Sequence, residues 1–222
     1  MPDLNFEVVG AEAEPFSAAP MLNFKLRITN TNAAEAIRNV SLQCQIRLEV
    51  MHRRYTPGEQ AKLVELFGEP GRWGDTLKGM LWTHTNVFVP SFTDRIDIDL
   101  PVPCTFDFNI AATKYFYGLD DGEVPLCLLF SGTVFYADET GALQISQIPW
   151  EKEANYRLPV NVWKQMMDIY YPNSAWLNIH RNVFEKLRKF KSQNAFPSWE
   201  GMFEMLLSDG EAKKKEKSAA TV

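Results

Sequence analysis

The stretch VSLQCQIRLEV, residues 40–50, decides the fold of this chain, because apolar and polar residues alternate in it without a break. Every second residue from Val40 to Val50 is apolar, and the residues between them are Ser, Gln, Arg and Glu. Successive side chains of a β-strand point to opposite faces, so a period of two predicts a strand with one buried and one solvated face.

The same alternation extends outward in both directions from this stretch. It recurs at residues 4–8, 22–28, 81–89, 96–100, 106–110, 124–136 and 143–145. Short strands at this spacing, separated by turn residues, are typical of antiparallel sandwiches. We therefore predict an α+β protein built on an antiparallel, immunoglobulin-like β-sandwich.

One helix interrupts the strands. In Thr56-Pro57-Gly58-Glu59, the threonine can cap a helix, proline suits its first position, and glutamate completes a capping box. The apolar spacing that follows and the glycine at position 68 predict an inserted helix near residues 57–67.

The strand Val124–Phe130 differs from the others because both of its faces are apolar. Such a strand is usually covered on both sides. Residues 162–170, 183–190 and 199–206 carry apolar stripes at helical spacing, and Asn182 and Ser198 can cap the second and third helices. We expect residues 1–157 to form the sandwich and residues 158–207 a C-terminal helical cap packed on one sheet. Residues 208–222, which include a lysine-rich run, are expected to be a disordered tail.

Composition excludes several classes of protein. The chain has 222 residues with a formal net charge of -5, whereas nucleic-acid-binding domains are usually basic. No apolar run approaches the roughly 20 residues of a membrane helix, and the N-terminus lacks the pattern of a secretory signal. The three cysteines show no metal-ligand spacing, which favours reduced thiols and a cytoplasmic location.

The sequence contains no recognisable catalytic, cofactor-binding or metal-binding motif. There is no H-E-x-x-H, phosphate-binding loop or G-x-S-x-G motif. His84 is expected to be a buried or half-buried structural histidine, and Cys104 is the one cysteine whose position allows exposure, since Cys44 and Cys127 fall inside apolar strands. Asp97 and Asp99 share one strand face, which favours a solvated face over a calcium site.

The loop at residues 68–75 holds the candidate partner-docking residues Arg72, Trp73 and Asp75. Two interpretations remain open. Trp73 can plug the edge of the core, with Arg72 and Asp75 pairing around it. Alternatively, the loop is a docking surface, since Trp and Arg are enriched at the centres of interfaces.

Three segments are specific enough to suggest a family. GRWGDTL at 71–77, LDDGEVPL at 119–126 and YYPNSAW at 170–176 resemble an uncharacterised bacterial family of unknown function. Members of that family are often encoded near nickel–iron hydrogenase genes. The resemblance implies an accessory role in assembly, maturation or scaffolding, with hydrogenase subunits or other proteins of the same gene cluster as partners. It supplies no catalytic residues.

The first hypothesis is therefore a non-enzymatic interaction protein without cofactors. The second is an enzyme of unrecognised type, with His84, Asp75, Arg72 or Cys104 meeting in a cleft between sheet and cap. The third is a binding protein for sugars or small ligands, which would use the aromatic residues of 114–118 and Trp150.

Overall fold

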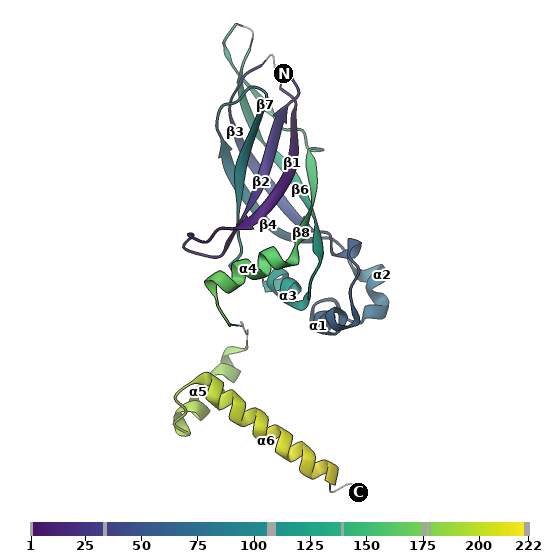
Figure 1. The fold of residues 1–222 in the computed structure, drawn as a ribbon, viewed down its shortest axis with the longest axis vertical. Coiled ribbons are helices and arrows are strands. Elements are labelled where there is room, and N and C mark those ends of the chain that lie inside the picture. The colour runs from purple at the N-terminus through teal and green to yellow at the C-terminus, as the bar shows by residue number, and fades with distance from the viewer. Residues whose placement is uncertain are drawn as a thin grey trace. The chain divides into compact units, whose positions relative to one another are not determined.

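The structure is a computed structural model that describes residues 2–32, 35–105, 110–138, 140–174, 177 and 179–219, with side chains up to residue 212. It confirms a mixed α+β protein with two antiparallel sheets, and the described residues form six α-helices (Figure 1). The chain divides into two compact units, residues 1–174 and 175–222, which we describe separately.

The first sheet has three strands in the order β1-β2-β5. These strands are β1 (Leu4–Ala13), β2 (Met21–Asn30) and β5 (Arg95–Pro103). All pairings are antiparallel, and β2 is the central strand.

The second sheet is built around β3 (Ile37–Leu48), which contains most of the stretch that decides the fold. Its strand order is β4-β3-β6-β7, and β8 also pairs with β6. The other strands are β4 (Met80–Val89), β6 (Glu123–Ala137), β7 (Leu143–Gln147) and β8 (Glu153–Pro159). The alternation in β3 has the predicted consequence, because its apolar residues from Val40 to Leu48 are all buried.

The inner faces of the two sheets pack against each other, as in a β-sandwich. Phe6 of β1 stacks on Phe130 of β6, with ring centroids 4.3 Å apart, and Phe24 of β2 meets Trp82 of β4 edge to face. We call this pair of sheets the two-sheet body. The immunoglobulin-like class of sandwich stays a prediction.

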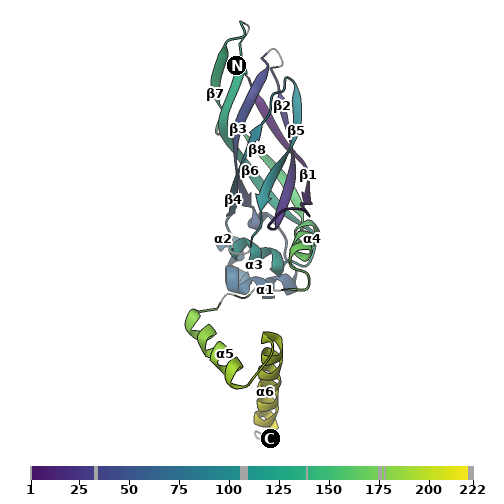
Figure 2. The same cartoon turned by 90° about the vertical axis from the view of Figure 1, so that its left-hand side faces the viewer.

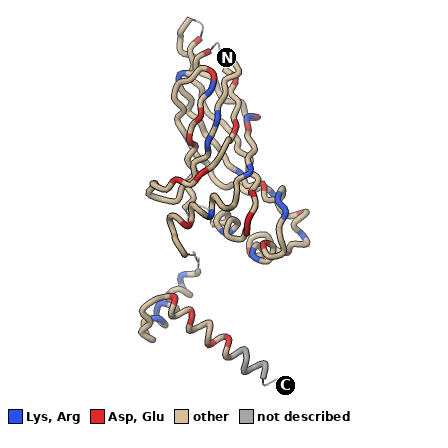
Figure 3. Tube along the Cα trace, viewed as in Figure 1, with Lys and Arg blue, Asp and Glu red and all other residues tan. Residues whose placement is uncertain are grey.

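The outer face of the three-stranded sheet carries paired charges (Figure 3). Arg27 of β2 pairs with Asp97 of β5 at 2.9 Å, and Lys25 pairs with Asp99 at 2.7 Å. Asp97 and Asp99 are exposed, so both lie on the solvated face that the sequence predicted. Cross-strand ion pairs account for them without a metal ion.

Four helices of the first unit gather at one end of the two-sheet body, which we call the helical end (Figures 1 and 2). They are α1 (Pro57–Phe67), α2 (Trp73–Thr76), α3 (Ile110–Gly118) and α4 (Val160–Tyr170). Helix α3 contacts both α1 and α4, and α4 contacts β1, β2 and β8. The predicted inserted helix is confirmed with its bounds, whereas α4 lies at the end of the sheets and not across one face.

The outer face of β6, which the sequence predicted to be covered, is partly covered by side chains of its own sheet. Cys127 and Leu129 are only half-buried on that face. Their neighbours on β3 and β8 include Arg47, Gln45 and Glu153, which face the same side in the ladder. The stems of such long polar side chains can cover apolar surface while their ends stay in water.

Two short 3₁₀ turns, Val50–His52 and Pro70–Arg72, flank α1 and lead into α2. The expected strand at 106–110 differs from the structure at its last residue, because Ile110 begins α3. Phe106 and Phe108 lie outside the described residues. Sequence patterning also missed β8, whose alternation rests on small or half-buried residues such as Ala154 and Tyr156.

The second unit contains α5 (Arg181–Gln193) and α6 (Trp199–Ala219). The cap of α6 is as predicted, since the Ser198 hydroxyl accepts a hydrogen bond from the Gly201 amide at 3.0 Å. Helix α6 continues to Ala219, so much of the expected disordered tail is helical. The boundary between compact units falls after Ser174, beyond α4, where the sequence placed it after residue 157. No helix in the described part of the chain is long and apolar enough to cross a membrane.

Candidate functional site

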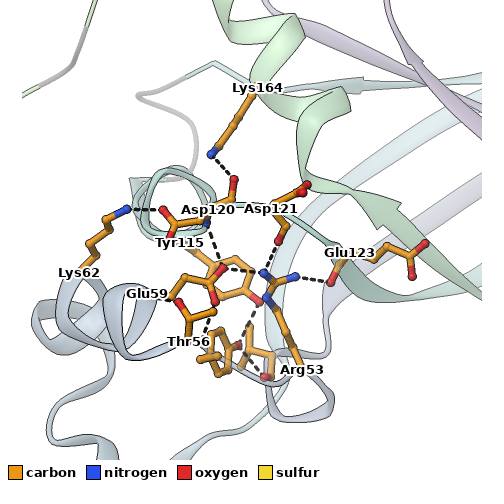
Figure 4. A network of polar contacts seen from close by, with 11 residues as sticks. Arg53, Thr56, Glu59, Lys62, Tyr115, Asp120, Asp121, Glu123 and Lys164 are labelled. Atoms are coloured by element: carbon orange, nitrogen blue, oxygen red, sulfur yellow. Dashed lines mark hydrogen bonds and ion pairs between the residues drawn. The ribbon is translucent and has the colours of Figure 1, made fainter.

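A buried ion pair between Arg53 and Glu59 anchors the helical end (Figure 4). Arg53 Nη2 lies 2.7 Å from Glu59 Oε1, and the two side chains are only 8% and 2% exposed. The same guanidinium donates to the carbonyl oxygens of Glu123 at 2.6 Å and Asp121 at 2.5 Å. One side chain therefore ties the start of α1 to the turn that leads into β6.

Both carboxylate oxygens of Glu59 accept hydrogen bonds. The Thr56 amide donates to Oε2 at 2.9 Å and the Asp120 amide donates to Oε1 at 3.0 Å. The Thr56 hydroxyl in turn accepts from the Glu59 amide, which completes the predicted capping box. Burial pushes the pKa of Glu59 upward, but the two amides and Arg53 together outweigh burial and leave its pKa below the ordinary value. An ionised carboxylate with partners on both of its oxygens serves as a structural joint.

Two tyrosines extend this joint into the core. The hydroxyl oxygens of Tyr55 and Tyr115 lie 3.0 Å apart, and the Tyr55 hydroxyl donates to the Val50 carbonyl at 2.7 Å. Burial raises the pKa of both phenols, so both stay neutral. Arg53 Cζ lies 5.8 Å from the Tyr55 ring centre, within range of a cation–π contact. Arg53 Nε is buried without a hydrogen-bond partner among the described residues.

Trp73 occupies the position that the plug interpretation describes. Its side chain is 7% exposed and packs edge to face against Tyr55 and Phe67, with ring centroids 5.3 Å and 5.5 Å apart. Its indole Nε1 donates to the Gly68 carbonyl at 2.9 Å, which satisfies its one polar atom. The tryptophan therefore joins the loop at 68–75 to the core.

Arg72 and Asp75 lie beside Trp73 but are exposed. The expected pairing between them is not seen, because no ion pair joins their side chains among the described residues. Arg72 ends a 3₁₀ turn, and its carbonyl accepts from the Thr76 hydroxyl at 3.0 Å. These two charges are thus accessible to a partner, and their role in docking stays a prediction.

A surface hollow opens directly after this loop. Its lining includes the half-buried apolar residues Leu66, Phe67, Leu77 and Met80, and the exposed residues Thr76 and Lys78. The four apolar side chains pack on the main core, so the floor of the hollow belongs to the rigid part of the helical end. We call this feature the helical-end hollow. Sequence analysis missed it, because its residues come from the end of α1, residues 76–80 and Ala111 of α3.

His84 differs from its expected position, because it is exposed on β4. It pairs in the ladder with Gln45 of β3 on the outer face of the second sheet. The register shift between Ile46 and Arg47 changes the alternation next to it, so Trp82 and Thr83 are both buried. A bulge of this kind cannot be recognised from the period alone.

The cysteines also differ from expectation. Cys104 is buried, and its thiol donates to the Val102 carbonyl at 3.3 Å, while burial raises its pKa to about 12. Cys127 is the half-buried cysteine, and burial and the nearby Glu153 carboxylate raise its pKa. Neither environment activates a thiolate nucleophile.

The aromatic residues of 114–118 belong to α3 and serve mainly as core. Tyr115 and Phe116 are fully buried, and Phe116 stacks on Trp163 of α4 at 4.9 Å between ring centroids. Trp150 is exposed in the turn between β7 and β8. The run therefore packs α3 on α4, which is the alternative role that such aromatic residues commonly have.

The described residues hold no group of three or more His, Cys, Asp or Glu side chains placed to share a metal ion. The four residues suggested for an enzyme differ in their exposure to solvent. Cys104 is buried, whereas Arg72, Asp75 and His84 are exposed. No hydrogen bond or ion pair connects these four side chains in the part of the chain that the structure describes.

The sequence analysis assigned no functional role to Arg53. The available signal was its place three residues before a capping box, since a buried acid at the third helical position needs a partner. The carbonyl groups of Asp121 and Glu123 come from a turn about seventy residues away, and no local pattern reveals such a contact.

Comparison with solved structures finds only distant similarity. The sporulation control protein Spo0M from Bacillus subtilis is 11% identical with a TM-score of 0.30, over 72% of this chain and 49% of that one. This chain thus spans about half of the Spo0M chain. The putative ApaA protein from Bordetella pertussis is 15% identical with a TM-score of 0.23, over 71% of this chain and 93% of that one. At these TM-scores neither similarity supports a conclusion about function.

No curated protein matches the sequence. The model of a family of unknown function matches residues 1–215, which is nearly the whole chain and includes all three segments on which the family resemblance rests. The chain therefore belongs to DUF6084, a family of unknown function.

Proposed function

We propose that this protein is a non-enzymatic interaction protein that binds a protein partner at its helical end. The observation that carries the proposal is the helical-end hollow, an apolar depression beside the exposed charges of Arg72 and Asp75. Apolar pockets rimmed by charged and polar groups are where interface hot spots form.

The construction of the helical end supports this proposal. The Arg53–Glu59 pair, the capping box and the Trp73 contacts hold the lining segments from α1 to β4 on the core. A surface that is already ordered loses little conformational entropy when it binds. The hollow is therefore suited to receive an apolar side chain of a partner.

The enzymatic alternative has weaker support. The buried acid and phenols of the helical end are occupied by structural hydrogen bonds, and the candidate catalytic residues are not brought together in the described residues. The resemblance of the sequence to a hydrogenase-associated family points to nickel–iron hydrogenase subunits as the first partners to test.

The test is affinity capture by the tagged full-length protein of purified hydrogenase subunits and of subunits in native extract. We expect Arg72→Ala and Leu77→Ser to weaken capture of the partner at least about tenfold, the size of one hot-spot contact. Arg95→Ala is the matched control, because Arg95 is exposed on β5 and pairs with Thr29 at the opposite end of the two-sheet body.

Equal capture by all variants would reject the helical-end hollow as the docking site. If no hydrogenase subunit is captured, nickel–iron hydrogenase is rejected as the partner. Turnover of a substrate by the purified protein would reject the non-enzymatic role.

A further inference from the structure

The second unit, α5 and α6, exposes apolar side chains on both of its helices. Helix α5 has no buried residue, although Val183 and Phe184 belong to its apolar stripe. On α6, Phe203 and Leu206 are exposed, and Leu207 is 69% exposed. Apolar stripes on surface helices normally face a core, so these two lack a covering layer within their own unit.

The described contacts between the two helices join both ends of α5 to the start of α6. Phe184 stacks on Trp199 with ring centroids 5.5 Å apart, and Lys191 lies over the same tryptophan and donates to the Phe196 carbonyl. Met202 is the one fully buried side chain among the described residues of this unit. Units of this size rarely stabilise themselves without oligomerisation or another constraint.

The charges of α5 are opposite to those of the first part of α6, before the lysine-rich run at 213–217 (Figure 3). Helix α5 has five Lys and Arg against one Glu, whereas the first fourteen residues of α6 have four acids and no Lys or Arg. Glu200, Glu204 and Glu211 share one face of α6 by their spacing of four and seven, and Lys186 and Lys189 share a face of α5. No ion pair joins the two helices among the described residues.

We propose that a second copy of this chain covers these faces, with α5 of each copy packed against α6 of the other. A two-fold interface is self-complementary, so the contact between a basic helix and an acidic helix occurs twice in the dimer. The apolar stripes of all four helices then form the core of a four-helix bundle, and the charged faces border it. The inference is independent of the proposed function, because it uses the other unit of the chain.

An anionic membrane surface is the competing occupant for a basic amphipathic helix. The acids of α6 argue against it, because they stand on a helix that exposes Leu206 and Leu207 and would be repelled by anionic lipid. A second copy pairs the basic residues of α5 with the acids of α6, whereas an anionic membrane attracts α5 and the lysines at 213–217 and repels those acids.

The experiment measures the mass of the full-length protein by sedimentation equilibrium over a range of concentrations, with two variants of opposite design. Lys186→Glu with Lys189→Glu places acids on the facing positions of α5 and α6 and removes the net positive charge of α5, and Glu204→Lys with Glu211→Lys places bases on those positions and removes the net negative charge of the first fourteen residues of α6. We expect the wild type to be a dimer and each variant alone to dissociate at least about tenfold more readily, as like charges then face each other.

Mixing the two variants is the decisive arm. In the mixture the acids introduced on α5 of one variant face the lysines introduced on α6 of the other, and the remaining helix pair keeps its wild-type charges, so we expect a heterodimer to form. Leu207→Ser is expected to weaken the wild-type dimer, and Leu143→Ser is its control, because Leu143 of β7 has a similar exposure of 64% in the first unit.

A wild type that stays monomeric at all concentrations would overturn the proposal. So would variants that dimerise like the wild type or that fail to associate when mixed. Sedimentation of a monomeric wild type with phosphatidylserine vesicles, but not with phosphatidylcholine vesicles, would assign α5 to a membrane surface instead.

Discussion

Arg53 and Glu59 show how a single pair of residues can hold several segments together. Arg53 contacts the start of α1 through Glu59, and it contacts the turn before β6 through two backbone carbonyl groups. Both charges are nearly excluded from water. A buried charge that loses its partner costs far more than an exposed one, because nothing replaces its hydration.

Removing either partner of this pair is expected to destabilise the protein strongly. Arg53→Met leaves the Glu59 carboxylate buried, and Glu59→Gln leaves the Arg53 guanidinium buried. Each should lower the free energy of unfolding by about 3–5 kcal/mol, measured by urea denaturation. The double variant should lose less unfolding free energy than the sum of the two single losses. Its second substitution removes a buried charge that the first has already left without a partner.

The control for this prediction is the exposed pair between Lys62 and Asp120, whose side chains are 51% and 54% exposed. Lys62→Met should cost only about 0–1 kcal/mol, because solvent screens that pair. A loss from Arg53→Met as small as that from Lys62→Met would contradict the structural role given to the buried pair.

Trp73 is expected to behave as a core residue. Trp73→Ala removes the ring contacts with Tyr55 and Phe67 and leaves the Gly68 carbonyl without its donor. The free energy of unfolding should fall by about 3–5 kcal/mol, the usual range for Trp→Ala in a core. Thermal or urea unfolding measures this loss, and Trp150→Ala, at a side chain that is 87% exposed, is the control. Unchanged stability in Trp73→Ala would show that the loop is not a plug.

At the scale of single elements, α1 follows directly from its sequence. Thr56, Pro57 and Glu59 each satisfy a local requirement of a helix start, so their pattern is sufficient to place the helix. Helix α3 is different. The alternation that ends at Ile110 predicts a strand, yet Tyr115 and Phe116 are buried in a helix against α1 and α4. At Ile110 itself, the packing of α3 decides for the helix over the period-two pattern.

The cap of α1 gives a prediction for that element. Thr56→Ala removes the hydroxyl that accepts from the Glu59 amide at 3.2 Å. The expected loss is about 1 kcal/mol of unfolding free energy, as for other N-caps. Thr76→Ala is the matched control: its hydroxyl is exposed near the end of α2, so a change within about 0.5 kcal/mol is expected. Equal effects of the two substitutions would exclude a special role for the cap.

At the scale of the whole molecule, several carboxyl groups link folding to pH. Hydrogen bonds from Lys152, Arg27 and Lys62 lower the pKa of Asp3, Asp97 and Asp120 below the ordinary value of 3.8. Hydrogen bonds from Thr140 and Gln144 lower the pKa of Asp138 to about 2. The pKa of Glu59 lies below its ordinary value of 4.5, although burial of the side chain acts to raise it.

These shifts predict acid destabilisation. A carboxyl group with a lowered pKa in the folded state stabilises the protein fully above its unfolded-state pKa, and this contribution is lost as pH falls through the folded-state pKa. Urea unfolding should therefore show stability falling from about pH 4.5 towards about pH 2. Glu59→Gln should flatten this decline. Constant stability across that window would contradict the hydrogen bonds assigned to these acids.

The sequence by itself determined most of the strands, the inserted helix and the helices near the C-terminus, because periodicity and capping depend on neighbours within a few residues. Only the tertiary structure decided which residues share a site. It buried Trp73 and Cys104, exposed His84, joined Arg53 to a turn seventy residues later and assembled the helical-end hollow from three segments. Such outcomes depend on which faces of distant elements meet, and local alternation carries no information about that choice.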